Sequence, residues 1–181
     1  MTPIGHAAAG YAVTYAALEI ANKPLPDQQI TSLIFWGIFW AVIVDWDQVI
    51  TLVVGKSLRL RVNKFNHRRS PSHAPLVWLA LCGIAYLFAN SPYGHTFTFV
   101  MLLGSMSHML LDSIEYGIMW RWPFGKKLYA LEPGLVLDFP QDGSLVGFYW
   151  NMTKAYAKTK TSYAEMFMVI FALVFFAFVS F

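Results

Sequence analysis

The sequence predicts an all-α protein, a polytopic transmembrane bundle of about five helices with a small polar cap between the last two. Its residues are 57% hydrophobic and only 13% charged, whereas soluble domains have about a quarter of their residues charged. Five apolar segments approach the roughly 20 residues that a spanning helix needs. They lie at about 4–21, 30–55, 74–90, 96–119 and 164–181. We therefore treat residues 1–181 as a single membrane-embedded domain.

The first two apolar segments are separated by a proline-containing stretch. The first segment is short and rich in alanine, and it is expected to be either a full span or a partly re-entrant helix. Pro24 and Pro26 end it, because proline disrupts a helix interior. The single cysteine, Cys82, excludes a disulfide framework and a thiolate metal site, and it is expected to be a small core residue. The N-terminal stretch has no basic region, so no cleavable signal peptide is expected.

The basic residues are distributed unequally between the loops. Twelve of the 13 Lys and Arg residues fall on one side if all five segments span, and only Lys23 falls on the other. The positive-inside rule makes the basic side cytoplasmic, with the N-terminus inside and the C-terminus outside. We expect an integral protein of a bacterial or archaeal cytoplasmic (inner) membrane, associated with the lipid bilayer.

The stretch at about 120–163 is too polar to span a membrane. Residues alternate in LYALEPGLVLDFP, and a QDG turn precedes SLVGFYW. This pattern predicts a small hairpin or an irregular cap over the helix ends. By contrast, ANSPYGHT is expected to be a loop on the opposite side, with His95 as a surface or interfacial residue.

Seven ionisable residues are expected to meet at the cytoplasmic edge of the bundle, because the segments that carry them alternate in direction. Ionisable groups in membrane segments are costly, and they usually face an interior and mark function. His108 and Asp112 are four residues apart and share a helix face. Asp45 and Asp47 diverge by about 200° on an ideal helix, so both reach one site only if the helix unwinds there. The candidate ligands are His6, Asp45, Asp47, His67, His73, His108 and Asp112.

Imidazole and carboxylate ligands together favour zinc or a similar transition metal. We expect one to three divalent ions, with Zn²⁺ favoured by this donor set. One carboxylate of the Asp45 and Asp47 pair is expected to be a ligand, and the other a bridging ligand or general base. Two structural alternatives stay open: Asp45 could pair with Arg68 or Arg69, and His108 alone could be an interhelical hydrogen-bond donor.

The segment HRRSPSH places Arg68 and Arg69 between two candidate ligands. Arginine suits bidentate recognition of phosphate, so Arg68 is a candidate catalytic residue together with Asp45 and Asp47. Ser70 and Ser72 are expected to cap the helix that follows. The alternative is that the basic residues only set topology or contact anionic lipid. Glu115 is expected either to support the metal site or to pair with Arg121.

Taken in order, the motifs TPIGHAAAGY, DWD, HRRSPSHAP, SHMLLDSIEYG and WPF resemble the YdjM-like family of LexA-regulated, membrane-bound, metal-dependent hydrolases. The resemblance covers about residues 1–125 and implies a metal centre formed by the seven candidate ligands. The family usually has a sequence closer to HRGxTHS, which leaves the substrate open. The pattern is also distantly similar to the zinc-dependent phospholipase C group, whose His and Asp residues hold clustered zinc ions that cleave phosphoesters.

The residues and the resemblance together predict a metal-dependent hydrolase, with zinc as the expected metal, that cleaves a phosphoester of a membrane lipid or lipid-linked substrate. No nucleic-acid partner is expected, and the sequence leaves the oligomeric state open. Two other classes are compatible with the residues: an ion or proton transporter, and a non-catalytic scaffold in which the metal only ties helices together.

Overall fold

The computed structural model describes residues 2–21, 25–54, 67–133, 137–140 and 143–180. These residues form seven α-helices and two short 3-10 helices, which confirms the predicted all-α class. Their only β-pairing is an isolated bridge between Ile118 and Tyr129. The elements in chain order are α1 (Pro3–Ala21), α2 (Asp27–Ile43), α3 (Trp46–Val54), η1 (His67–Arg69), η2 (Pro71–His73), α4 (Pro75–Phe88), α5 (Pro92–Asp112), α6 (Leu145–Tyr156) and α7 (Lys160–Ser180).

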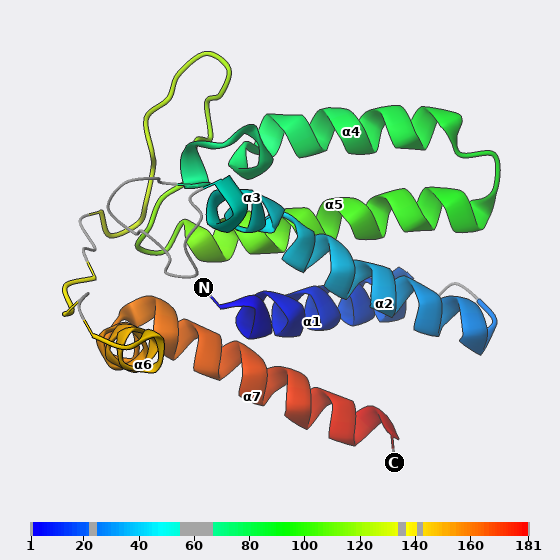
Figure 1. The fold of residues 1–181 in the computed structure, drawn as a ribbon. Helices are drawn as coiled ribbons and strands as arrows, with labels where there is room; N and C mark the ends of the chain where they lie inside the picture. The colour runs from blue at the N-terminus through cyan, green and yellow to red at the C-terminus, as the bar shows by residue number, and fades with distance from the viewer. Residues whose placement is uncertain (1, 22–24, 55–66, 134–136, 141–142, 181) are drawn as a thin grey trace.

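Helices α1, α2, α4, α5 and α7 run alongside one another and form a bundle (Figure 1). α1 packs against α2, α5 and α7, and α5 also packs against α2 and α4. The N-terminus, α3 and α6 lie at one end of the bundle, and the C-terminus lies at the other (Figure 1). All seven candidate ligands belong to segments that begin, end or turn at the end that carries α3.

Glycines allow α1, α2 and α5 to approach closely. A Cβ added to Gly104 of α5 would lie 2.6 Å from the carbonyl oxygen of Gly37 in α2, and one added to Gly10 of α1 would lie 2.7 Å from the same oxygen. Small residues at such crossings are a common means of packing helices in membranes. The three helices that meet here include two that carry candidate ligands directly, and α2 leads into Asp45.

The second apolar segment does not form one helix. α2 ends at Ile43, and α3 begins at Trp46 after a turn at Val44 and Asp45. At this point hydrogen bonds between residues three positions apart replace the α-helical pattern. Asp45 N donates to Val42 O (3.1 Å), and Gln48 N donates to Asp45 O (2.9 Å). This local unwinding is the condition under which both carboxylates can reach one region.

The fourth apolar segment is displaced toward the N-terminus relative to the sequence prediction. Ser91 accepts a hydrogen bond from Gly94 N (3.0 Å), and Pro92 occupies the first helical position, so the helix begins inside the expected ANSPYGHT loop. α5 ends at Asp112 rather than near residue 119. Gly117, with φ +85°, then turns the chain, and its N–H donates to Asp112 O (3.0 Å).

Of the two alternatives predicted for 120–163, a small hairpin or an irregular cap, the described residues show the irregular cap. The Ile118–Tyr129 bridge is isolated, and the stretch instead contains a helix, α6, that the sequence analysis did not predict. Ser144 caps α6 by accepting a hydrogen bond from Gly147 N (3.1 Å). Phe148 of α6 is buried and packs against Phe139. The polar cap therefore consists of irregular chain and a short helix.

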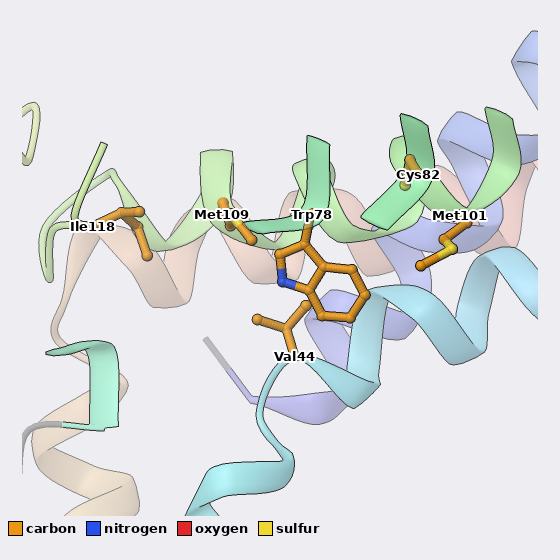
Figure 2. Close-up of a cluster of buried hydrophobic side chains, with 6 residues drawn as sticks. All are labelled: Val44, Trp78, Cys82, Met101, Met109 and Ile118. Atoms are coloured by element: carbon orange, nitrogen blue, oxygen red, sulfur yellow. The ribbon is translucent and has the colours of Figure 1, made fainter. Parts of the chain in front are cut away.

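A buried apolar cluster lies next to the end that carries the candidate ligands (Figure 2). Trp78 of α4 belongs to this cluster with Val44, and its indole N–H donates to the carbonyl oxygen of Ser72 (2.7 Å). This contact fixes the junction between η2 and α4. Cys82 is buried and free, as predicted. The cluster consists of Val44, Trp78, Cys82, Met101, Met109 and Ile118.

One described helix is long and apolar enough, by length and composition, to cross a membrane: Lys160–Phe178 within α7. Most of its large side chains are exposed, including Phe167, Phe176 and Phe178. The shorter helix α4 is also apolar and exposes Leu79 and Leu87 on its outer side. Continuous exposed apolar surface of this kind marks contact with lipid or with another protein.

Candidate metal centre

The structure brings all seven candidate ligands to one end of the bundle. His6 lies in the first turn of α1, Asp45 lies in the turn between α2 and α3, and Asp47 begins α3. His67 and His73 lie in η1 and η2, and His108 and Asp112 lie in the last turns of α5. Three overlapping sets have ligand atoms within 4.8 Å of one another: His6, His108 and Asp112; Asp45, His73 and His108; and His67, His73 and Asp112.

His108 has a ring orientation suited to metal binding. Its Nδ1 lies 2.7 Å from the carbonyl oxygen of Ala41, an atom that can only accept, so Nδ1 carries the proton. A neutral imidazole then presents the lone pair of Nε2 to the cluster. His108 is thus an interhelical donor through one nitrogen and a candidate ligand through the other. Its Nε2 is buried and has no hydrogen-bond partner among the described residues.

His6 lies against His108 at the centre of the site. The two rings stack with centroids 3.6 Å apart and planes inclined by 14°. His6 is fully buried, and neither of its ring nitrogens has a hydrogen-bond partner among the described residues. Its Nε2 lies 3.6 Å from Asp112 Oδ1. Buried polar atoms are normally hydrogen-bonded, so an exception of this kind needs an explanation such as an ion.

Asp45 faces three imidazoles through a single oxygen. Its Oδ1 lies 3.2 Å from His73 Nε2, 3.5 Å from His67 Nε2 and 3.6 Å from His108 Nε2. These contacts of Asp45 are with histidines, whereas the alternative considered from the sequence was a salt bridge with Arg68 or Arg69. The helix break at Asp45 thus turns its carboxylate toward the three histidines.

Asp47 lies behind His73 rather than among the sets of candidate ligands. Its Oδ2 accepts a hydrogen bond from Ser72 Oγ (2.9 Å) and lies 3.5 Å from His73 Nδ1. The other nitrogen of the same ring faces Asp45. A carboxylate on the far nitrogen of a ligating histidine orients that ring and raises its basicity. The geometry therefore favours a supporting role for Asp47 over direct ligation.

The serines of HRRSPSH do not cap α4 as expected. The residue before α4 is Ala74, and Ser70 makes no side-chain capping bond at η2. Ser72 instead donates to Asp47 and lies 3.1 Å from His73 Nδ1. Its backbone is held by Trp78. The proline at the start of each helix, Pro71 and Pro75, limits the need for a side-chain cap.

Arg68 pairs with Asp112. Its Nε donates to Asp112 Oδ2 at 2.7 Å, and its guanidinium carbon lies 4.1 Å from the ring centroid of Tyr116. The Asp112 side chain is fully buried, so the arginine offsets the cost of burying this carboxylate. Burial is the main factor that raises the pKa of Tyr116 to about 12, so its hydroxyl stays protonated beside this pair. The phosphate-binding role of Arg68 stays a prediction.

The donor set fits a divalent cation. Three carboxylates and one guanidinium share the site, which leaves a net negative charge when the imidazoles are neutral. Two ligands of a tetrahedral zinc ion with bonds of about 2.0–2.1 Å lie about 3.3–3.4 Å apart. His6 Nε2 lies 3.6 Å from Asp112 Oδ1, and His108 Nε2 lies 3.6 Å from Asp45 Oδ1. Both distances are slightly too long for a hydrogen bond and close to the separation of two zinc ligands.

The site is most accessible beside η1. His6, His73, His108 and Asp112 are fully buried, whereas Asp45, Arg68 and His67 retain 10%, 12% and 16% of their side-chain exposure. Burial and the neighbouring Arg68 lower the pKa of His67 to about 3, so its imidazole is neutral at physiological pH. Its Nε2 also lies 3.3 Å from the side-chain amide nitrogen of Gln48.

His95 lies away from this centre. Its ring lies against that of Tyr86, with centroids 4.4 Å apart and planes inclined by 45°, near the N-terminal end of α5. The two residues line an apolar cavity of about 270 Å³ between α1, α4 and α5. The position agrees with the prediction that His95 belongs to the opposite end of the bundle. The sequence did not point to three other groups at the metal centre: Gln48 beside His67, Tyr116 beside Arg68, and the Ala41 carbonyl that orients His108. Single polar residues and backbone atoms leave no distinguishing pattern in a sequence.

Glu115 has a different partner from those predicted. Its side chain accepts from the backbone N–H groups of Lys160 (3.2 Å) and Thr161 (2.6 Å), so it caps the N-terminus of α7. It therefore ties the end of α5 to the last helix. Neither the expected pairing with Arg121 nor a contact with a candidate ligand accounts for its burial.

The comparisons with known proteins identify one family. The sequence matches the family described as YdjM inner membrane protein over residues 1–181, which extends the resemblance beyond the N-terminal motifs into the cap and the last helix. No match was found among curated proteins or among solved structures. The distant likeness to zinc-dependent phospholipase C thus stays a prediction. A match over the full sequence, together with the apolar surface of α7, shows a membrane protein, and the chain belongs to the YdjM inner membrane protein family.

Proposed function

We propose that this protein is a membrane-embedded, metal-dependent hydrolase that cleaves phosphoester bonds at the cytoplasmic side of the inner membrane. The observation that carries the proposal is the buried cluster of His and Asp side chains in which the nitrogens of His6 and the Nε2 of His108 have no hydrogen-bond partner among the described residues. Perturbed, convergent ionisable groups of this kind are typical of a catalytic centre. His6, His67, His73, His108 and Asp112 would hold the metal, and Asp45 would lie beside it, facing three of these histidines.

A bound zinc-like ion would supply Lewis acidity, which lowers the pKa of a water molecule and polarises a phosphoryl oxygen. Asp45 is the better candidate for general base because it faces the cluster and retains exposure. It would take a proton from the attacking water as the new P–O bond forms, and return it to the alcohol that leaves when the ester P–O bond breaks. Asp47 and Ser72 would hold His73 in place. Arg68 would bind the phosphate group while anchored at Asp112.

The proposed substrate class is a phosphoester of a membrane lipid or of a lipid-linked molecule. The least buried residues of the centre, Asp45, His67 and Arg68, lie at the end of the bundle where α3 and α6 are found. In a bundle of five spans this end would lie at headgroup level. α3 supports this placement because Trp46, Val49 and Ile50 leave its outer face apolar and exposed. Aromatic and apolar residues of this kind are typical of the membrane interface.

The transporter alternative has less support. A relay for protons or cations needs polar groups along the path through the bilayer. The buried acidic residues of the described chain are Asp47, Asp112, Glu115 and Glu165. All lie near the same end, because Asp47 and Asp112 contact candidate ligands, and Glu115 and Glu165 accept from the first residues of α7 and α1. The scaffold alternative shares the metal and differs only in chemistry, so it is separated by an activity measurement rather than by geometry.

The sidedness of the centre is tested by thiol labelling in intact cells. In a Cys82→Ala background, a cysteine in place of Ser57, which lies outside the described residues, should be protected from a membrane-impermeant reagent. A cysteine in place of the exposed Asn90 should be labelled. Asn90 is preferable to Ser91, whose side chain caps α5. Labelling of position 57 and protection of position 90 would instead place the centre on the outer face.

Hydrolysis is tested directly with purified protein in mixed micelles. Wild-type protein loaded with zinc should release phosphate or headgroup from at least one member of a panel of phospholipids and isoprenoid phosphates. A chelator should abolish the release, and added zinc should restore it. Metal-loaded protein that hydrolyses none of the panel but conducts ions in vesicles would support the transporter. Neither hydrolysis nor flux, with metal-dependent stability retained, would support the scaffold.

A further inference from the structure

We infer that Glu165, in the last helix, is a positioning residue that sets the place of His6 in the metal centre. Glu165 lies in the second turn of α7. It is only 8% exposed, whereas most large side chains of that helix are exposed. Its carboxylate accepts hydrogen bonds from Thr2 N (3.2 Å) and Gly5 N (3.2 Å). The hydroxyls of Thr2 and Tyr156 also donate to it.

These partners explain how a carboxylate is tolerated in an apolar helix. The first N–H groups of a helix have no intrahelical acceptor, and they attract negative charge. Glu165 fills this role for α1 from a helix more than 150 residues away in sequence. Burial, together with the hydrogen bond to Glu165, raises the pKa of Tyr156, so this residue remains a proton donor to the carboxylate.

His6 depends on this anchor more than the other buried histidines do. His108 is oriented by the Ala41 carbonyl, and His73 is oriented by Asp47 and Ser72. The ring nitrogens of His6 have no such partner among the described residues. Its ring position is therefore determined by the stack on His108 and by the backbone of the first turn of α1. Glu165 is the group that holds this turn in place, through the residue that directly precedes His6.

Gly5 makes the close approach of Glu165 possible. A Cβ added at Gly5 would lie 2.5 Å from Glu165 Cγ and 2.8 Å from its Cδ, too close for any real contact. A side chain here would force the carboxylate away from the N–H groups that it caps. The glycine in the motif TPIGH is thus explained by the last helix rather than by the metal centre itself.

Two capping carboxylates link three helices into one unit around the centre. Glu115, one turn beyond Asp112, caps α7, and Glu165 of α7 caps α1. The position of His6 relative to Asp112 is therefore set along a path that runs from α5 through α7 to α1. This gives the last helix, for which the sequence motifs offered no role, a specific contribution to the geometry of the site.

The inference rests on the proposed metal centre but not on hydrolysis, so it is tested by metal affinity. Zinc affinity would be measured by chelator competition in detergent micelles. Glu165→Gln, which keeps the shape but removes the charge, should weaken zinc binding by about tenfold, the lower end of the effect of groups that orient metal ligands. Gly5→Ala should act in the same direction. The matched controls are Gly83→Ala, where an added Cβ meets nothing within 4 Å, and Glu132→Gln, an exposed partner of Lys160.

A double-variant cycle separates positioning from a general loss of stability. In a His6→Ala background, Glu165→Gln should cause no further loss of affinity, because the residue through which it acts is gone. Equal losses in both backgrounds, or wild-type affinity for Glu165→Gln alone, would overturn the inference. If Glu165→Gln does not fold, Tyr156→Phe, which removes one donor and keeps the carboxylate, is measured in the same two backgrounds with the same criterion. Wild-type protein that binds no zinc would overturn the metal centre and, with it, this inference.

Discussion

Replacing His108 or Asp112 by alanine should remove most of the metal that the wild-type protein carries. Each of these residues belongs to two of the three sets of candidate ligands, so either change affects more than one possible ion position. Protein purified in mild detergent without a chelator should contain roughly stoichiometric zinc or a similar transition metal by elemental analysis. The two variants should contain far less, and their thermal stability should no longer rise when zinc is added.

The control for this experiment is His95→Ala. His95 lies on the same helix as His108 but contacts Tyr86 away from the cluster, so its loss should leave the metal content unchanged. Asp47→Asn offers an intermediate case. Because Asp47 contacts the far nitrogen of His73, its loss should weaken affinity by about 10–100-fold without abolishing binding. Metal-free wild-type protein that gains no stability from zinc would contradict the existence of the centre.

The second large effect is expected for Asp45→Asn, measured as turnover per bound metal. Asparagine keeps the size of the side chain and an oxygen that faces the histidines, but it cannot accept a proton at neutral pH. If Asp45 is the general base, turnover should fall by about 10²–10⁴-fold while much of the metal remains. The measurement combines elemental analysis with release of phosphate or headgroup from the substrate identified in the micelle panel.

Asp47→Asn is the matched comparison because it changes the same chemical group two residues away. At saturating zinc its turnover per bound metal should stay near that of the wild type, since Asp47 acts on His73 rather than on water. If turnover per bound metal instead fell in Asp47→Asn and stayed near the wild-type value in Asp45→Asn, Asp47 would be the general base. A loss of metal and turnover in equal proportion in Asp45→Asn would make Asp45 a ligand only.

The architecture was predictable from the sequence because the bilayer imposes a simple rule. The apolar segments locate helices α1, α2, α4, α5 and α7, although the second segment breaks after Ile43 and α5 begins and ends earlier than expected. Helix ends were less predictable, since they depend on single capping residues such as Ser91. α6 was missed because its 12 residues are too few for a span, and the QDG turn before them was taken as part of a hairpin or irregular cap. Among the described helices, α7 alone has the length and composition to cross a membrane, and the bundle of five spans stays a prediction.

The candidate site was predictable in its members but not in their roles. Alternating direction of the helices was enough to place seven His and Asp residues at one end. Their roles depend on which ring nitrogen each carboxylate faces: Asp45 lies 3.2 Å from Nε2 of His73, and Asp47 lies 3.5 Å from Nδ1 of the same ring. Sequence spacing does not contain this information, because the turn at Asp45 determines which way each carboxylate points.

By itself the sequence determined the membrane class, the all-α fold and the residues that form the cluster, because hydropathy and charge act on each segment independently of its neighbours. Only the tertiary structure decided that Arg68 pairs with Asp112, that Glu115 caps α7 and that Glu165 caps α1. Each of these contacts joins residues 44 or more positions apart, and each is favourable because a buried charge must find a partner from whichever segment packs beside it. Which segment that is depends on the packing of the whole bundle.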